Sequence, residues 1–591
     1  MRTKTNIPSI DRTHLKETTF MERHPFIPGF ISIANAMNLL SFKGNRYVID
    51  CLELRVRANE VKEDSKLLAD TLVYLGVKPG EIVTCVMPNY YQAFLVFHAA
   101  NTIGAVVTFL SNHASKDEIR DYLNEYRSKV LINMNDGPEI NQYYKENTGV
   151  QYILSMDPEQ VNSRDFFQYP AEHIQGQSYL NFHAIGNIAK LQTRRYKTWF
   201  GGKQECLILH TSGSTGKPKS MVFTNENVLA ALIYCRDAAH SPANDPTAHK
   251  WMNVVPFMYP YGLVDSVLGP ILDKRELIFV PDVTVNCIAE AYAKQPNYVM
   301  GSPAFLEMTK KGMPTDQDCS SVNTFISGGD FLSAQKSLEA VEFFKQHGAN
   351  IKMANGAGNG EILGCCTSGI GVEYRPETVG KLVAGPEQLV LNPDTLEEVP
   401  YGVPGVIYVH GKHVFQRYFG NPKATEEAMV TINGKKYYCT GNYGILYEDR
   451  YFELIGRASR FYIVGTLNKV YCEGVQKRIS LLPMVDGCIV VPKPNDENLY
   501  EGKAYVKLKE QTEPTEELKA QILAACQEPY LDEESGKQLV LKDYEIPASV
   551  TFIEEIRRNR DSDKVAYEYY KELAEQEYQA EKIQRKEGSR E

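Results

Sequence analysis

The sequence lacks the features that mark secreted, membrane-spanning and zinc-binding proteins. Residues 1–30 mix charges with prolines and contain no apolar stretch of the kind found in a secretory signal. The most apolar segment, 93–110, is interrupted by polar residues and glycine, so it predicts a core helix followed by a buried strand and excludes a membrane span. The twelve cysteines form no C-x-x-C pair, which excludes a zinc framework and favours free thiols in a reducing cytosol. We therefore expect a cytoplasmic protein.

A surplus of positive charge is also missing. The 591 residues carry 64 Lys and Arg against 74 Asp and Glu, a formal net charge of −10. Binding nucleic acid through charge requires a basic face, so nucleic acid is excluded as a partner. Any polyanionic ligand must instead be held by a few local positive groups. The length predicts several domains, and 43% hydrophobic residues suffice for a large core.

Short apolar runs alternate with helical segments over most of the chain, which predicts an α/β protein with parallel sheets. A helix is expected over 58–74, with strands over 82–87, 105–110 and 129–132, and the rhythm continues from 205 to 364. The segment 380–455 differs, because turn sequences at 392–394, 402–405 and 433–434 separate short β-rich runs. We expect a small antiparallel β region there.

A smaller α+β unit follows residue 457. Its predicted strands are 488–491, 504–508 and 550–553, and its predicted helix is 516–525. From 561 to 591 the chain is dense in charges of both signs, which predicts a solvated helix or a frayed tail.

One segment stands out chemically: T-S-G-S-T-G-K-P-K-S, residues 211–220, directly after the apolar run 206–209. Small residues let a backbone loop close around phosphate oxygens, and its N–H groups and hydroxyls become donors. The loop is not a Walker A motif, because only two residues separate Gly213 from Gly216. On composition alone, a polar surface loop is the alternative.

These ten residues resemble the phosphate-binding loop of the adenylate-forming superfamily, which includes acyl-CoA synthetases, adenylation domains and luciferases. The family pattern is T-S-G-[ST]-T-G-x-P-K-G, and only Ser220 departs from it. Other segments resemble the family's motifs in the family's order: V-V-P-F-M-Y-P-Y-G-L (254–263), S-G-G-D (327–330), N-G-A-G-N-G-E (355–361), Y-C-T-G-N (438–442) and G-R-A-S (456–459). The resemblance covers roughly residues 30 to 570.

The resemblance implies a fold and a division of the chain. Residues 1–456 would form a large domain of two parallel or mixed α/β subdomains with the β-rich region 380–455. Residues 457–570 would form a smaller, mobile α+β domain, and 571–591 a charged helical tail. Ser459 would lie at the hinge between the two domains.

The resemblance also implies the cofactors ATP, Mg²⁺ and coenzyme A. The residues that the resemblance implies for nucleotide binding are Thr211, Ser212, Gly213, Ser214, Thr215, Gly216, Lys217, Lys219, Gly328, Gly329, Gly356, Ala357, Gly358, Asn442 and Arg457. Thr215 and Glu361 would be catalytic and lie nearest Mg²⁺. Lys564 would neutralise the charge that develops between carboxylate and α-phosphate, a task that suits a compact, flexible cation. For Arg457 the alternative is an interdomain salt bridge, and for Lys564 an ordinary surface lysine.

Several positions depart from the family pattern. Ala357 replaces an aromatic residue that would stack on adenine, and Gly360 replaces a threonine. Asn442 replaces the ribose-binding aspartate, so the charge-assisted part of that hydrogen bond is lost. Ser459 replaces the hinge aspartate, and Lys564 lies in R-R-N-R-D-S-D-K where the family has P-x-T-x-x-G-K.

The segment 254–270 bears on the substrate. Its predicted pocket residues are Met258, Tyr259, Tyr261, Gly262 and Asp265. Tyr261 stands where amino-acid-activating relatives have an aspartate, which disfavours a simple α-amino acid because a buried ammonium without a partner is costly. The aromatic and apolar wall favours an aryl or medium-length acyl acid, although such residues also serve as plain core.

Three functions remain open at this point. The first is an acid–thiol ligase that makes an acyl-adenylate and transfers the acyl group to coenzyme A. The second is transfer to the phosphopantetheine thiol of an acyl carrier protein or to an amine. The third is a non-catalytic protein that binds a nucleotide or an acyl-adenylate, which Ala357, Gly360, Asn442 and the context of Lys564 would favour.

Overall fold

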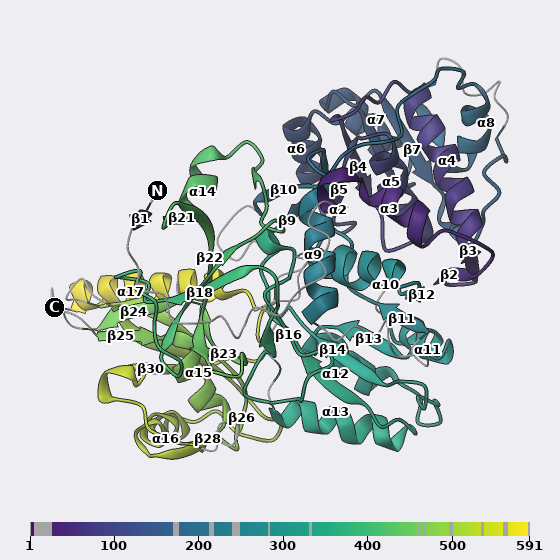
Figure 1. The fold of residues 1–591 in the computed structure, drawn as a ribbon. Coiled ribbons are helices and arrows are strands. Elements are labelled where there is room, and N and C mark those ends of the chain that lie inside the picture. The colour runs from purple at the N-terminus through teal and green to yellow at the C-terminus, as the bar shows by residue number, and fades with distance from the viewer. Residues whose placement is uncertain are drawn as a thin grey trace.

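The computed structural model describes residues 2–4, 27–169, 177–211, 218–238, 249–281, 284–329, 332, 334–457, 460–464, 468–495, 500–532, 537–558 and 565–588. Within these ranges the fold is α/β with mixed parallel sheets and an antiparallel region, as predicted (Figure 1). No helix in them is long and apolar enough to cross a membrane. All twelve cysteines are free thiols.

The first α/β unit is built on a sheet ordered β20-β10-β9-β5-β4-β6-β7-β8, parallel from β9 to β8. Its strands are β4 (Ile82–Val86), β5 (Val106–Leu110), β6 (Val130–Met134), β7 (Tyr152–Met156), β8 (Tyr179–Asn181), β9 (Glu205–His210), β10 (Ser220–Thr224) and β20 (Arg417–Tyr418). Its helices are α4 (Ala58–Tyr74), α5 (Tyr91–Thr102), α6 (Lys116–Tyr126), α7 (Pro138–Asn147) and α8 (Ile185–Lys190). The apolar segment 93–110 lies in α5 and β5 and is almost wholly buried, which confirms the predicted core helix and strand.

The second α/β unit is built on a sheet ordered β15-β14-β13-β11-β12-β2-β3, in which only β3 runs antiparallel. Its strands are β2 (Tyr47–Cys51), β3 (Leu54–Arg57), β11 (Lys250–Asn253), β12 (Glu276–Phe279), β13 (Tyr298–Gly301), β14 (Thr324–Ser327) and β15 (Lys352–Asn355). Its helices are α3 (Ile33–Leu40), α9 (Asn225–Ala238), α10 (Gly269–Leu272), α11 (Val285–Ala293), α12 (Pro303–Gly312) and α13 (Ala334–Gln346), together with a π-helix over Tyr261–Leu268 (η6).

A third, mostly antiparallel sheet confirms the predicted β region. It contains β18 (Glu387–Leu391), β19 (Pro404–His410), β21 (Met429–Ile432), β22 (Lys435–Leu446) and β23 (Phe452–Arg457). Asn433 and Gly434, both with positive φ, form the tight turn between β21 and β22. The turn expected over 402–405 is shorter than predicted, because Pro404 and Gly405 already belong to β19. An additional strand, β1 (Arg2–Lys4), was not expected from the sequence and pairs with β21.

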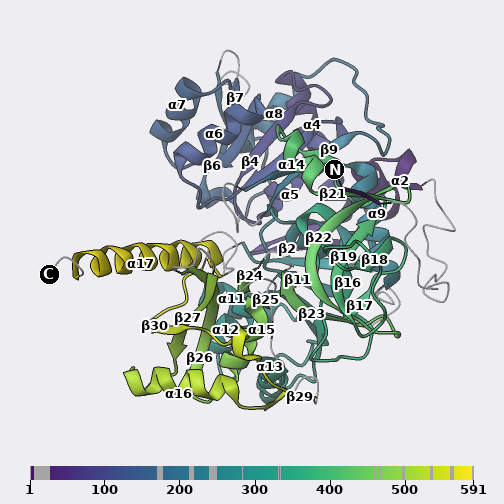
Figure 2. The ribbon, with the colours of Figure 1, turned by 90° about the vertical axis from the view of Figure 1, so that its left-hand side faces the viewer.

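The last part of the chain has its own hydrophobic core, which starts at Tyr462. Its elements are β24 (Phe461–Val464), β25 (Asn468–Tyr471), α15 (Cys472–Ser480), β26 (Val485–Pro494), β27 (Tyr500–Leu508), α16 (Glu516–Gln527), β28 (Tyr530–Asp532), β29 (Lys537–Leu539), β30 (Ser549–Phe552) and α17 (Tyr567–Gly588). Figure 2 shows α17 lying across one side of this part. The helix is more than a solvated tail, since Tyr570 and Ala574 are buried and Glu581 pairs with Lys493.

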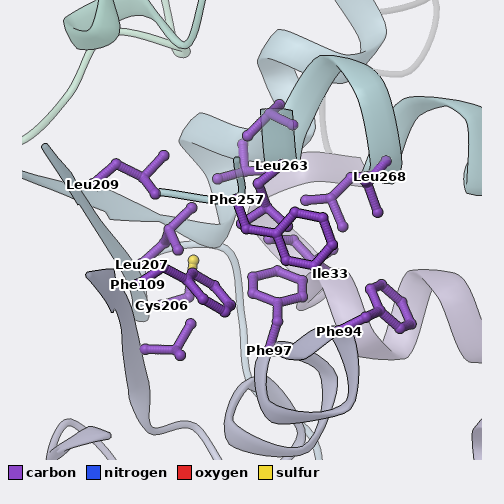
Figure 3. Close-up of a cluster of buried hydrophobic side chains, with 14 of the residues drawn as sticks. Ile33, Phe94, Phe97, Phe109, Cys206, Leu207, Leu209, Phe257, Leu263 and Leu268 are labelled. Atoms are coloured by element: carbon purple, nitrogen blue, oxygen red, sulfur yellow. The ribbon is translucent and has the colours of Figure 1, made fainter. Parts of the chain in front are cut away.

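A large hydrophobic cluster joins the two α/β units. Figure 3 shows Phe97 of α5 packed with residues from β5, β9 and η6, among them Phe109, Leu207 and Leu263. Phe97 and Leu263 have no exposed surface. This cluster fixes the relative position of the two sheets and therefore the shape of the space between their strand ends.

We predict that Phe97→Ala lowers the free energy of unfolding by about 3–5 kcal/mol, because it leaves a cavity in this cluster. The matched control is Phe30→Ala, since Phe30 is 74% exposed, and the control should change stability by less than about 0.5 kcal/mol. Denaturant unfolding followed by fluorescence measures both. Equal, small losses in the two variants would contradict the assignment of Phe97 to the core.

Candidate nucleotide and acid site

A cleft of about 2600 Å³ lies where the strands of the two α/β sheets, the antiparallel sheet and the last part of the chain meet. Ligands in open α/β sheets commonly bind beyond the carboxyl ends of parallel strands. The cleft brings together most of the predicted site residues that the structure describes: Thr211, Lys219, Met258, Tyr259, Tyr261, Asp265, Gly328, Gly329, Gly356, Ala357, Gly358, Glu361, Asn442 and Arg457.

Gly262 is placed differently. It does not line the cleft, and a Cβ at this position would lie 2.1 Å from the carbonyl oxygen of Pro256. Its carbonyl accepts a hydrogen bond from Asn253. Gly262 therefore lets η6 pack tightly against the preceding loop and contacts no ligand space. This corrects its assignment to the substrate pocket.

The two ends of the phosphate loop are held together at the end of the β9–β10 hairpin. The N–H of Thr211 donates to the carbonyl of Lys219 (3.0 Å), and the N–H of Lys219 donates to the hydroxyl of Thr211 (2.9 Å). The intervening predicted residues, Ser212, Gly213, Ser214, Thr215, Gly216 and Lys217, lie outside the described residues, as do Ser459 and Lys564. Their roles stay predictions.

Ser220, the one departure within the loop motif, is buried and has a defined partner. Its hydroxyl lies 2.6 Å from the hydroxyl of Tyr126, which also lies 2.8 Å from Nε2 of His210. Burial raises the pKa of Tyr126, so the phenol stays protonated. The serine therefore ties the start of β10 to α6, which a glycine could not do. Sequence reasoning missed Tyr126 because it lies 94 residues from Ser220 in the chain, and it also missed His210, although this residue directly precedes Thr211.

Glu361 is buried beside the phosphate loop and is held by a tyrosine. Tyr418 donates its hydroxyl proton to Oε1 of Glu361 (2.6 Å), and the N–H of Phe415 donates to the carbonyl of Glu361 (2.8 Å). Burial, and next the charge of Glu361, raise the pKa of Tyr418, so the phenol remains the donor. Nζ of Lys219 lies 5.0 Å from the centre of the Tyr418 ring. Sequence reasoning missed Tyr418 as well.

These contacts allow a test of the predicted magnesium site. Among the described residues, no group of three His, Cys, Asp or Glu side chains could hold a metal ion. A single buried carboxylate fits Mg²⁺, which commonly binds through one or two carboxylates plus the phosphates of a nucleotide. Glu361 therefore fits a metal that arrives with its nucleotide.

Asn442 is engaged by a neighbouring amide. Its Nδ2 donates to Oδ1 of Asn359 (3.1 Å), while Nδ2 of Asn359 donates to the carbonyl of Thr440 (2.8 Å). Because a carbonyl only accepts, this second bond fixes which way the Asn359 amide faces. Arg457 donates to the same Thr440 carbonyl (2.9 Å). The predicted ribose-side residues are thus locked together on β22 and β23.

The alternative for Arg457 was an interdomain salt bridge. The ion pair near the predicted hinge is formed by Arg460. Arg460 forms the ion pair with Glu473 at the start of α15 (3.5 Å), whereas Arg457 contributes its backbone N–H to the same carboxylate (3.3 Å). Burial raises the pKa of Glu473. Glu473 therefore connects both sides of the predicted hinge.

The surroundings of the Gly-rich turn after β15 bear on two other departures, Ala357 and Gly360. The N–H of Ala357 donates to the hydroxyl of Thr367 (2.9 Å), so the turn is anchored without an aromatic side chain. A Cβ at Gly358 would lie 1.9 Å from the carbonyl of Gly364, and a Cβ at Gly360 would lie 2.6 Å from the Cε of Met221. A side chain at 360 would require the flexible end of Met221, which occupies that space, to move.

Two polar groups of the pocket segment that line the cleft are the phenol of Tyr261 and the carboxyl of Asp265. Tyr261 points its hydroxyl at the carbonyls of Gly301 and Ile326, both at 3.1 Å, and its ring packs against Gly328. Asp265 lies one turn further along, near Cys235 (3.8 Å). Burial raises the pKa of Asp265 well above the usual value of a carboxyl.

We predict that Asn442→Asp is destabilising even though aspartate is the family's residue. The new carboxylate would face the fixed oxygen of Asn359, at a cost of about 1–3 kcal/mol in the free energy of unfolding. The repulsion raises the pKa of the new carboxyl in the folded state, and the protonated form can donate to Asn359. The penalty is therefore absent below the pKa of the unfolded chain and grows as the pH rises through the folded pKa.

Denaturant unfolding at pH 5 and pH 8 measures this penalty. Asn433→Asp in the exposed β21–β22 turn is the matched control. Greater stability of Asn442→Asp than of the natural protein at pH 8 would show that the Asn359 amide turns over.

Comparisons with known proteins agree with this geometry. A model of the family described as AMP-binding enzyme matches residues 46–419. The acyl-CoA ligase SID4 of Ajellomyces capsulatus is 23% identical over 77% of this chain and 78% of its own length. The putative acyl-CoA ligase YdaB of Bacillus subtilis (strain 168) is 25% identical over 83% of this chain and 89% of its own.

A solved structure confirms the fold. The anthranilate CoA ligase AuaEII in complex with anthranoyl-AMP superposes with a TM-score of 0.75 at 18% identity, covering 93% of this chain and 98% of that one. The family match covers more than half of the chain, in the region where Thr211 and Lys219 at the ends of the phosphate loop, the pocket segment and the Gly-rich turn line the cleft. The chain therefore belongs to the AMP-binding enzymes, the adenylate-forming superfamily that its motifs resemble.

Proposed function

We propose that the protein is an ATP-dependent acid–thiol ligase. A carboxylate oxygen of the acid attacks the α-phosphorus of ATP, the bond to pyrophosphate breaks, and an acyl-adenylate forms. The thiol sulfur of coenzyme A then attacks the acyl carbon, AMP leaves, and the thiol proton is released. The named ligases among the relatives support this reaction type.

One observation carries the proposal. The ends of the phosphate loop, the buried carboxylate of Glu361 and the Asn442–Arg457 pair line one cleft, although they come from three different sheets. Adenylyl transfer depends mainly on positioning and charge neutralisation, which such a set of groups supplies. Bound Mg²⁺ would neutralise phosphate charge beside Glu361. Aryl or medium-length acyl acids suit the apolar and aromatic wall formed by Met258, Tyr259 and Tyr261.

A second candidate is a protein that binds a nucleotide or acyl-adenylate without catalysis. It is favoured by the engagement of Asn442 with Asn359 and by Met221 at the place of a threonine side chain. Transfer of the acyl group to a carrier-protein thiol or an amine is the alternative to coenzyme A.

Acid-dependent exchange of label between pyrophosphate and ATP tests the proposal. A panel of aryl, fatty and amino acids is assayed with the natural protein, followed by thioester formation with and without coenzyme A. Exchange with at least one acid supports the ligase. If no acid of the panel gives exchange while calorimetry still shows nucleotide binding, the result supports the non-catalytic protein.

We predict that Glu361→Gln lowers the exchange rate about 100-fold and raises the Mg²⁺ concentration needed for half-maximal rate, because the charge facing the metal is lost. Glu387→Gln is the matched control, since Glu387 also accepts a hydrogen bond from a tyrosine, Tyr437, but does not line the cleft. An unchanged Mg²⁺ dependence in Glu361→Gln would show that this carboxylate does not face the metal.

We also predict that Lys564→Ala suppresses acyl-adenylate formation by about 100-fold or more, as expected when a positioned cation is removed from the developing charge. Lys219→Ala should weaken exchange less, because the backbone of Lys219 still closes the loop on Thr211. Single-turnover formation of the acyl-adenylate measures both. Full adenylation in Lys564→Ala would show that another lysine performs this task.

A further inference from the structure

Asp265 is an acidic residue on a mostly apolar element. It belongs to η6, in which Leu263, Val264, Val267 and Leu268 are fully buried. Figure 3 shows Leu263 and Leu268 within the central cluster, so this face of η6 is core. The side chain of Asp265 instead lines the cleft. A π-helix is a rare element that occurs most often at functional sites, because it turns side chains out of regular register.

The carboxyl of Asp265 makes few polar contacts with the described residues. Its one hydrogen-bond partner among the described residues is the weakly polar thiol of Cys235, at 3.8 Å from Oδ1, and it makes no ion pair with them. Tyr261, one turn earlier, donates its hydroxyl to the carbonyls of Gly301 and Ile326 and so has no proton left for Asp265. A half-buried carboxyl without a proper partner is costly and calls for a compensating group.

The space around the carboxyl is kept open by glycine. Gly364 has a φ of +77°, and a Cβ there would lie 2.5 Å from Oδ2 of Asp265. Any side chain at 364 would therefore displace the carboxyl. The helix that carries Cys235, α9, contributes only apolar residues besides this cysteine to the lining of the cleft: Leu229, Leu232 and Ile233. The carboxyl of Asp265 thus lies beside an apolar helix.

From this geometry we infer that Asp265 selects acids that carry a hydrogen-bond donor, a hydroxyl or an amino group, on the part of the molecule away from the reacting carboxylate. The inference rests on the proposed function, because it places the acid in this part of the cleft. A plain hydrocarbon acid would cover the carboxyl without giving it a partner. Sites built to hydrogen-bond a substrate group discriminate strongly against the analogue that lacks it.

The two kinds of donor differ in what they need from Asp265. A hydroxyl needs only an acceptor oxygen, which an asparagine also provides. An ammonium gains from the negative charge, which asparagine lacks. Asp265→Asn therefore separates them, and Asp265→Leu removes recognition of both.

Calorimetric binding of matched acids tests the inference without requiring turnover. The probes are benzoate with its meta- and para-hydroxy and amino derivatives, and octanoate with its terminal hydroxy and amino derivatives. We expect the natural protein to bind at least one donor-bearing acid 10- to 100-fold more tightly than its plain parent. Asp265→Leu should lose that preference. Glu339→Gln, which alters another carboxyl lining the cleft, is the control and should keep it.

Two results would overturn the inference: equal or tighter binding of the plain parents by the natural protein, including no binding of any donor-bearing acid, or an unchanged preference in both Asp265 variants. Asp265→Asn keeps the size of the side chain, so it tests the charge even where Asp265→Leu fails to fold. Failure of the proposed function gives a different result, namely donor-dependent binding with no ATP–pyrophosphate exchange for any acid.

Discussion

The arrangement of the cleft depends on one hydrogen bond, from Tyr418 to the buried carboxylate of Glu361. Glu361 follows β15 of the second α/β sheet, Tyr418 lies on β20 at the edge of the first, and Tyr438 of the antiparallel sheet contacts Asn359 two residues before Glu361. Three sheets therefore meet around one side chain. A carboxylate held this way costs little reorganisation when a cation arrives, because its position is already set by a phenol that burial keeps protonated.

What the sequence could predict follows from how local the determining interactions are. Helix Ala58–Tyr74 and the turn at Asn433 and Gly434 come from periodicity and from backbone preferences within a few residues. Glu361, Asn442 and Arg457, which the motifs assign to one site, line one cleft in the structure, and their roles there stay predictions. Tyr418 and Tyr126 could not be found this way. They act across 57 and 94 residues of chain, and a tyrosine in a strand or helix has no local pattern that distinguishes it from ordinary core.

Three departures from the family pattern have a neighbour that fits them. Ser220 bonds to Tyr126, Asn442 to Asn359, and Gly360 leaves room for Met221. A substitution taken alone suggests loss of function, because it removes a group that relatives use. A substitution with a matched partner indicates a site that has been repacked as a unit, since an orphaned polar group in a buried cleft would be destabilising. Restoring single family residues is therefore not a neutral change in this chain.

The two ends of the cleft differ in the hydrogen-bond partners that their polar side chains have. At the nucleotide end, the side chains of Ser220, Glu361 and Asn442 each have a hydrogen-bond partner elsewhere in the protein. At the acid end, the one hydrogen-bond partner of Asp265 in the described part of the chain is a thiol, while the phenol one turn away donates to backbone carbonyls. A polar group that the fold leaves without an adequate partner is compatible with stability only if it is neutral or if a ligand completes it. Burial favours the neutral form in the empty cleft, and a bound donor would favour the charged one. The chemistry of the acid is therefore determined where the protein leaves its own hydrogen bonding incomplete.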